Sequence, residues 1–147
     1  MTTTEVADLV DVNVLLGAAW PSHVHHRPAV GWFRRRGGRP WATTAFTETA
    51  FVRISSNPKA IPTAVAPREA LSLLDRLRRW PGHRFLEDKV QMVTGEASAF
   101  HNVSTHRQVT DAHLLAVARQ QGVRLVTLDR GLLTLADDQY LEVIPAS

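Results

Sequence analysis

"LVDVNVLLGAAW", Leu9 to Trp20, places one acidic side chain inside an almost wholly apolar run. The stretch from Val6 to Val12 has the length and composition of a strand buried on both faces, as in a parallel sheet. Asp11 lies at the carboxyl end of this strand. Asn13 is of a type that begins helices, and Val14–Ala19 predicts a short helix. Because burying an unpaired carboxylate is costly, Asp11 requires a partner or a function.

The same alternation of strand and helix continues along the chain. Strands are predicted at 40–44, 83–87, 123–129 and 140–144, and helices at 25–36, 45–56, 67–80, 110–121 and 130–137. We expect Thr110 to cap the 110–121 helix and Gly122 to end it. The stretch 90–108 has no firm pattern, although 95–100 suits the start of a short helix. The alternation predicts an α/β fold, in which residues 1–147 form one domain with a central parallel sheet flanked by helices.

Length and composition narrow the class of protein. A chain of 147 residues is long enough for one hydrophobic core. It contains no cysteine, which excludes disulfides and thiolate zinc sites and suits a reducing compartment. No signal peptide or membrane-spanning run is apparent, so we expect a cytoplasmic protein with no membrane partner. Lys59 and Lys89 are two of the 17 basic residues, which leaves 15 arginines. Arginine suits nucleic-acid phosphates, although a GC-rich genome explains its abundance equally well.

Four acids fall where this fold gathers functional side chains. Asp129 ends its predicted strand as Asp11 ends the first. Asp111 precedes Leu114 at helical spacing, which puts it on the core-facing stripe of its helix. Glu48 falls at the border of the apolar face of the 45–56 helix. In a parallel sheet, strand ends and the following helix starts meet along one edge, so these carboxylates are expected to converge.

Convergent carboxylates point to a hard metal ion. Two carboxylates about 4 Å apart repel by about 4 kcal/mol at an effective dielectric of 20. Such a group takes up protons or binds a cation, and oxygen-only ligands favour Mg²⁺ or Mn²⁺, which activate water and polarise phosphodiesters. Each acid taken singly also has a structural explanation, as a turn former or as compensation for a helix dipole. The remaining acids of interest are interpreted as solvent-facing or turn residues: Asp8, Glu87, Asp88, Asp137 and Asp138.

Four blocks together resemble the PIN-domain ribonuclease toxins of the VapC type: "LVDVNVLLGAAWPSHVHH", "TETAFVRISSNP", "VTDAHLLAVA" and "LVTLDRGL". They occur in the order and spacing of that family over nearly the whole chain. The resemblance implies a metal-dependent endoribonuclease with Asp11, Glu48, Asp111 and Asp129 in its active site. The three aspartates would hold one or two Mg²⁺ ions, with Mn²⁺ as an alternative, and Glu48 would complete the site or help deprotonate water. Asn13 follows a family pattern and would orient Asp11 or a metal-bound water.

The same resemblance implies partners. Members of the family usually act on RNA, are neutralised by a VapB-type antitoxin and commonly form homodimers. Two alternatives to a toxin stay open: a non-catalytic RNA-binding PIN-like module and a stand-alone RNA-processing nuclease. A phosphatase of the haloacid dehalogenase type is disfavoured because it needs a second aspartate where this chain has Asn13.

Other polar residues have competing interpretations. Ser55 falls near Glu48 on the helical wheel, where it would hydrogen-bond a metal-bound water, but Ser/Asn/Pro chemistry favours a helix end and turn. The cluster of His23, His25 and His26 has no placed acid partner, and metal binding there is the less favoured hypothesis. The arginines of 34–36 are interpreted as solvent-facing cations at a helix end. The four tryptophans are interpreted as core or interface residues: Trp20, Trp32, Trp41 and Trp80.

Overall fold

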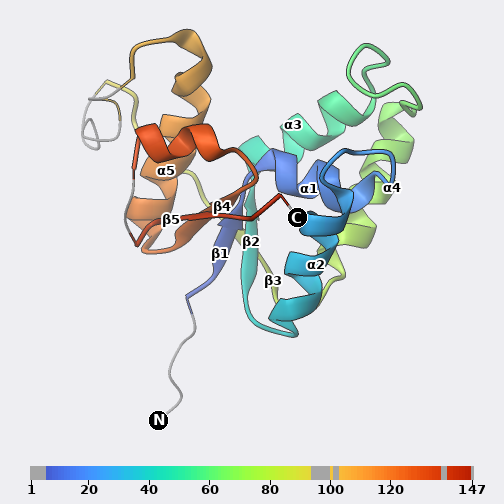
Figure 1. The fold of residues 1–147 in the computed structure, drawn as a ribbon, viewed down its shortest axis with the longest axis horizontal. Helices are drawn as coiled ribbons and strands as arrows, with labels where there is room; N and C mark the ends of the chain where they lie inside the picture. The colour runs from blue at the N-terminus through green and yellow to red at the C-terminus, as the bar shows by residue number, and fades with distance from the viewer. Residues whose placement is uncertain (1–5, 94–99, 101–102, 137–138, 147) are drawn as a thin grey trace.

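Five parallel strands form one twisted sheet at the centre of the molecule (Figure 1). The computed structural model describes residues 6–93, 100, 103–136 and 139–146. The strands are β1 (Asp8–Val10), β2 (Trp41–Thr44), β3 (His83–Leu86), β4 (Arg124–Thr127) and β5 (Leu141–Val143). They lie in the order β3-β2-β1-β4-β5, and every neighbouring pair is parallel. The α/β architecture predicted from the sequence is confirmed.

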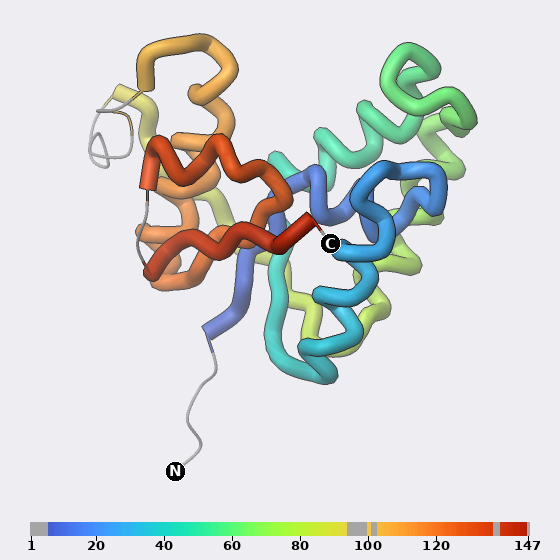
Figure 2. Tube along the Cα trace, in the orientation of Figure 1, coloured from blue at the N-terminus to red at the C-terminus, as the bar shows by residue number. Residues whose placement is uncertain are grey.

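Helices cover both faces of the sheet. They are α1 (Val12–Ala19), α2 (His26–Arg36), α3 (Ala45–Ser55), α4 (Pro67–Arg78) and α5 (Val109–Gln121), with short 3₁₀ turns at η2 (His106–Gln108) and η3 (Arg130–Thr134). The first four helices pack together on one face, whereas α5 and η3 pack on the other (Figures 1 and 2). The sheet therefore separates the amino-terminal helices from the carboxyl-terminal part of the chain.

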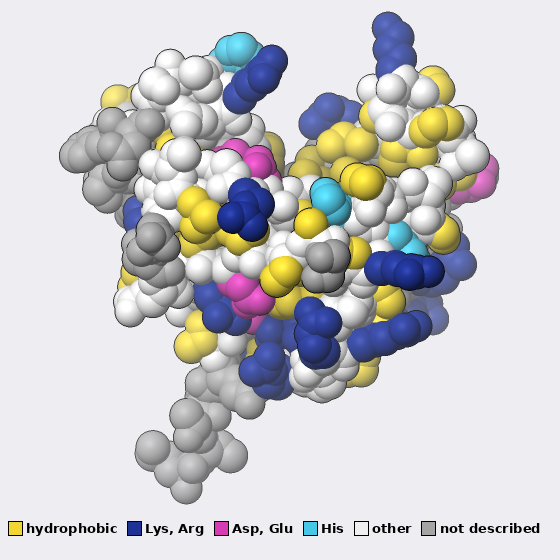
Figure 3. Space-filling view, in the orientation of Figure 1, with side chains coloured by type: hydrophobic (Ala, Val, Ile, Leu, Met, Phe, Trp, Pro, Cys, Tyr) yellow, Lys and Arg dark blue, Asp and Glu magenta, His cyan; other side chains and the backbone are white. Residues whose placement is uncertain are grey.

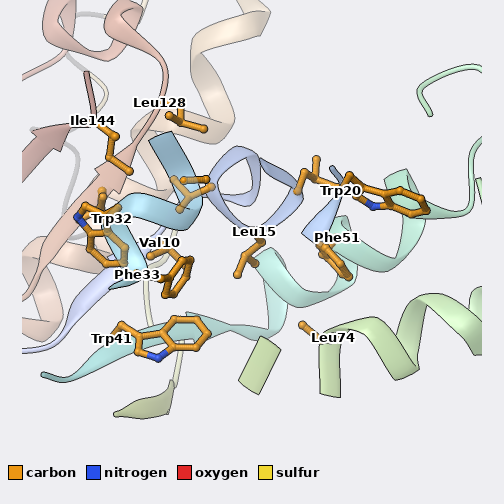
Figure 4. Close-up of a cluster of buried hydrophobic side chains, with 14 of the residues drawn as sticks. Val10, Leu15, Trp20, Trp32, Phe33, Trp41, Phe51, Leu74, Leu128 and Ile144 are labelled. Atoms are coloured by element: carbon orange, nitrogen blue, oxygen red, sulfur yellow. The ribbon is translucent and has the colours of Figure 1, made fainter. Parts of the chain in front are cut away.

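Alternate residues of each strand supply the two halves of the core. Val10 and Trp41 pack beneath α1–α4, while Leu9 and Ala42 pack beneath α5. Trp41 is fully buried and meets Phe33 edge-on, with ring centroids 4.8 Å apart (Figure 4). Fully burying such side chains contributes about 1.5–3 kcal/mol each. Of the four tryptophans, three are buried, as expected for core residues, and Trp80 is partly buried against the same cluster.

Two helix starts differ from the sequence prediction. Asp11, not Asn13, caps α1: its Oδ1 accepts the backbone N–H of Val12 at 2.7 Å. Both residue types cap helices, and the strand ends two residues too early for Asn13 to serve. Helix α5 begins at Val109, so Thr110 lies inside the helix and is not its cap. Its end is as predicted, because Gly122 adopts the left-handed conformation with φ 67°.

The prediction that Arg36 and Asp8 face solvent is wrong. Both are buried and form an ion pair with each other, and Arg36 also donates to the carbonyl of Pro40. Arg124 adds a second cation, with its Nη2 3.1 Å from Asp8 Oδ2. This network ties the end of α2 to the first residues of β1 and β4. It lies at the amino-terminal edge of the sheet.

Several elements are shorter than the apolar patterns indicated. The predicted helix at 130–137 is the five-residue 3₁₀ turn η3, and α4 ends two residues before the predicted 80. The hypothesised short helix at 95–100 falls mainly outside the described residues, as do Asp137 and Asp138. Within the described part of the chain, no helix combines the length and the apolar character that crossing a membrane requires.

Candidate active site

Three of the four predicted acids meet at the carboxyl edge of the sheet. Asp11 follows β1, Asp129 follows β4 by two residues, and Asp111 lies in the first turn of α5. Their charges act on one another, since Asp11 and Asp129 both raise the pKa of Asp111. Figure 3 shows acidic side chains in a hollow between the two upper parts of the molecule. Asp11 thus interacts electrostatically with two residues that lie 100 or more positions further along the chain.

Asp11 is the most enclosed of the three. It is 4% exposed, and burial raises the pKa of its carboxyl above the ordinary value. Hydrogen bonds from Thr127 and from the backbone N–H of Val12 act in the opposite direction, while the charge of Asp129 adds to the increase. Capping α1 therefore fixes the Asp11 carboxylate in position, and its burial costs solvation free energy.

Thr127 is the centre of a buried hydrogen-bond network. Its Oγ1 donates to Oδ2 of Asp11 at 2.8 Å. The same oxygen accepts a hydrogen bond from Nδ2 of Asn13 at 3.2 Å and from the backbone N–H of Asp129 at 3.1 Å. Asn13 completes the link through Oδ1, which accepts the backbone N–H of Leu128 at 3.2 Å. Asn13 thus reaches Asp11 through a threonine that the sequence analysis did not single out.

The pKa of Asp111 is strongly shifted by its surroundings. Burial, followed by the charges of Asp11 and Asp129, raises its pKa to about 6. Asp129 is more open to solvent, and its Oδ1 accepts the backbone N–H of Gly131 at 2.8 Å. A Cβ on Gly131 would lie 3.0 Å from that oxygen, so glycine permits the close approach. The three carboxylates belong to different structural elements, and their negative charges interact.

Glu48 is engaged on the other side of this edge. Its Oε2 accepts the hydroxyl of Thr43 at 2.6 Å, and its Oε1 lies 3.4 Å from Nη1 of Arg78. The Thr43 hydroxyl also lies 2.8 Å from Nε2 of His83. Since the single hydroxyl proton goes to the carboxylate, His83 must donate through Nε2. Burial and the nearby Arg78 lower the pKa of His83, which favours a neutral ring with its proton at that nitrogen.

Ser55 and the histidine cluster lie away from the acids. The buried hydroxyl of Ser55 accepts the indole N–H of Trp20 at 3.0 Å, which joins the end of α3 to the end of α1. At the start of α2, Nδ1 of His23 accepts the backbone N–H of His25 at 3.0 Å. Nδ1 of His26 donates to the carbonyl of Gly17 at 2.8 Å. Ser55 and His26 therefore join neighbouring helices, and His23 stabilises the turn that precedes α2.

The donor set suits a hard divalent cation. Carboxylate oxygens are the ligands that Mg²⁺ and Mn²⁺ prefer. The negative charge of Asp129 raises the pKa of Asp11, and the charges of Asp11 and Asp129 raise the pKa of Asp111, so a bound cation would relieve this repulsion. As the side chains stand, no three His, Asp or Glu residues of the described ranges are arranged as a ready metal-ligand group. By charge and donor chemistry the three aspartates fit such an ion.

Three polar residues were missed by the sequence analysis: Thr127 and Thr43 near this edge, and His83, the first residue of β3, whose side chain reaches Thr43. Threonine is common in buried strands for its β-branched shape, so neither threonine stands out by residue type. For the two threonines, position in the chain was the one feature that could have indicated a role in the site. Thr127 lies two residues before Asp129, and Thr43 lies at the carboxyl end of β2, where functional groups gather.

Comparisons with known proteins agree with this architecture. The PIN-domain family model matches residues 9–138. Ribonuclease VapC38 of Mycobacterium tuberculosis is 47% identical over 131 residues, which cover 89% of this chain and 91% of that protein. Ribonuclease VapC39 of the same organism is 43% identical over 136 residues, covering 92% of this chain and 98% of that protein.

Solved structures share the fold at low identity. The sarcin-ricin loop cleaving toxin VapC20 of Mycobacterium tuberculosis has a TM-score of 0.64 at 15% identity, with 95% of this chain and 100% of that chain covered. DNA-bound VapBC from Salmonella typhimurium has a TM-score of 0.63 at 11% identity, covering 97% and 99% of the two chains. With the family match and the extent of identity to the curated relatives, this chain belongs to the PIN-domain family, and within it to the VapC ribonucleases.

Proposed function

We propose that this protein is a Mg²⁺- or Mn²⁺-dependent endoribonuclease that hydrolyses phosphodiester bonds in RNA, and that it acts in the cytoplasm as the toxin of a toxin–antitoxin pair. The observation that carries the proposal is the electrostatic coupling of Asp11, Asp111 and Asp129, which come from three distant segments. The curated relatives are named ribonucleases, which supports RNA as the substrate.

Each acid has a separate role in the proposed reaction. Asp11, Asp111 and Asp129 would hold the metal, and Glu48 would accept a proton from the attacking water. The metal, when bound, supplies polarisation of the phosphodiester and a lower pKa for that water. Thr127 keeps Asp11 oriented by donating to Oδ2. Thr43 likewise fixes Oε2 of Glu48, and Oε1 faces Arg78.

Glu48 has different partners from the three aspartates. Its carboxylate is held by Thr43 and Arg78, and not by contact with the three aspartates. The pair with Arg78 is loose, at 3.4 Å with a half-exposed guanidinium, and such pairs contribute about 0–1 kcal/mol. The ion pair therefore restrains this carboxylate only weakly, and the hydrogen bond from Thr43 is the contact that holds it.

RNA cleavage by the purified protein tests the proposal. Cellular RNA is expected to be cut at discrete positions with Mg²⁺ or Mn²⁺, and cutting is expected to stop in EDTA. Asp11→Asn should abolish cleavage while the thermal transition stays cooperative. Asp75→Asn is the matched control, since Asp75 is an exposed acid on α4 that pairs with Arg79. Full activity in EDTA, or in Asp11→Asn, would contradict the metal role.

The toxin assignment requires partners. We propose a VapB-type antitoxin and a homodimer, on the basis of the family and of solved relatives described as VapBC complexes. Expression of the wild-type chain should arrest growth, and co-expression of the neighbouring small reading frame should restore it. Arrest that no neighbouring gene relieves would favour a stand-alone processing nuclease, and RNA binding without cleavage would favour a non-catalytic module.

A further inference from the structure

Phe46 is an exposed aromatic residue at the edge of the acid site. It lies in the first turn of α3, two residues after β2 ends at the carboxyl edge of the sheet and two residues before Glu48. Its side chain belongs to neither hydrophobic cluster of the described core, and the residue is 37% exposed. Packing of the core therefore does not explain a phenylalanine at this position.

The ring of Phe46 bridges to the helix that carries Asp111. It contacts the imidazole of His113 on α5, with ring centroids 5.8 Å apart and planes tilted by 59°. His113 is held in turn by a hydrogen bond between its Nε2 and the carboxylate of Asp88. Since the two rings are tilted by 59°, the imidazole contacts Phe46 without stacking flat on it, as a base would. This pair, called the wall below, joins the start of α3 to the start of α5, the two helices that carry Glu48 and Asp111.

We propose that Phe46, supported by His113, is a stacking platform for an unpaired RNA base next to the scissile phosphate. This inference rests on the proposed ribonuclease function. A phosphodiester reaching the aspartates must carry its flanking nucleotides along the same edge of the sheet, where Phe46 and His113 lie. Stacking of bases on aromatic side chains is the usual way in which proteins bind single-stranded RNA, and it tolerates many sequences.

The chemistry of the wall favours a base over a protein partner. A single aromatic ring between charged groups offers little contiguous apolar area for a protein interface, whereas one ring face matches one base. The scissile phosphate is taken up at the proposed metal site, so the flanking base and not the backbone is expected to meet the ring. A fixed imidazole behind Phe46 also limits the ordering needed on binding.

A binding experiment with three 12-nucleotide strands tests the inference. Fluorescence anisotropy is measured in Mg²⁺ buffer in the cleavage-silent Asp11→Asn background, with oligoadenylate, oligouridylate and an abasic ribose-phosphate strand of equal length. Phe46→Ala is expected to weaken oligoadenylate binding at least about fivefold, the loss of one stacked base. The loss should be smaller for oligouridylate and absent for the abasic strand. Phe46→Tyr should retain the affinity of the parent.

Phe85→Ala is the matched control. Phe85 is an exposed phenylalanine on β3 (49% exposed) that contacts the guanidinium of Arg78 and not the wall. Equal losses in both variants, or a loss on the abasic strand, would overturn the platform. So would unchanged oligoadenylate binding together with weaker binding of a protein partner. Cleavage by the wild-type protein is scored separately: if RNA is cut and Phe46 has no effect on affinity, only this inference fails, whereas absence of any cleavage removes the proposed function as well.

Discussion

The hydroxyl of Thr127 donates to Oδ2 of Asp11 at 2.8 Å, across 116 positions of sequence. Both groups are buried, at 0% and 4% exposure. This bond joins the end of β4 to the start of α1 and lowers the pKa of Asp11 against the larger opposing effect of burial. The carboxylate central to the proposed chemistry therefore depends on a neutral residue for its orientation and for part of its charge.

Removing this hydroxyl should damage both stability and activity. Thr127→Val keeps the shape but leaves Asp11, Asn13 and the N–H of Asp129 each without one partner. Leaving a buried polar group unsatisfied costs about 1–3 kcal/mol. We predict a lower midpoint in urea unfolding and a large loss of RNA cleavage. Thr127→Ser, which restores the hydroxyl, should recover most of the activity; a silent Thr127→Val would show that Asp11 needs no such support.

Asp111 should destabilise the metal-free protein at neutral pH. Because its pKa in the folded state is raised from 3.8 to about 6, the folded state binds the proton more tightly than the unfolded chain. Stability is then lost as pH rises from about 4 to 6 and stays reduced above. Asp111→Asn removes this effect and should raise the free energy of unfolding by about 1 kcal/mol at pH 7.5, after discounting for solvent screening.

The comparison at low pH is the control for this prediction. At pH 4.5, where wild-type Asp111 is largely protonated, the variant and the wild type should melt at nearly the same temperature without metal. A lower melting temperature for Asp111→Asn at pH 7.5 would instead identify Asp111 as a carboxylate that stabilises the start of α5 through the helix dipole.

The sequence analysis identified the acidic residues of the site but not all of the residues that orient them. Asp11 and Asp129 stand out because each ends an apolar run, and strand ends in a parallel sheet meet at one edge. Thr127 does not stand out, since a threonine inside a buried strand satisfies strand propensity alone. Asn13 and Asp11 are both good capping residues two positions apart, so only the exact end of β1 decides between them.

The buried ion pair of Arg36 and Asp8 lay beyond pattern analysis for a different reason. Three consecutive arginines at a helix end are explained by the helix dipole alone. Nothing local distinguishes Arg36 from Arg34 and Arg35, and its partner is 28 residues away. Burial of one arginine of the three depends on how α2 lies against the sheet, which is a property of the tertiary structure.

This pair gives a stability prediction with a built-in control. Arg36→Met should destabilise the fold by about 3–5 kcal/mol, because it leaves Asp8 buried with only the half-exposed Arg124 beside it. Arg35→Met, one residue earlier and exposed, should change stability by less than about 0.5 kcal/mol. Urea unfolding of the two variants measures the difference. Similar midpoints would mean that Arg124 alone compensates Asp8.

Metal binding should be visible as stabilisation even without substrate. An ion that binds only the folded protein stabilises it by about 2.7 kcal/mol at one hundred times its dissociation constant. We predict that Mg²⁺ or Mn²⁺ raises the melting temperature of the wild type above that in NaCl of equal ionic strength. Asp11→Asn and Asp111→Asn should lose most of this shift, since each removes one of the proposed negative ligands, whereas Asp75→Asn should keep it. Together with the pH experiment, the sign of the Asp111→Asn effect is expected to reverse: more stable than wild type without metal, and less stable with saturating metal. A variant that stays more stable in both conditions would mean that Asp111 does not contribute to holding the ion.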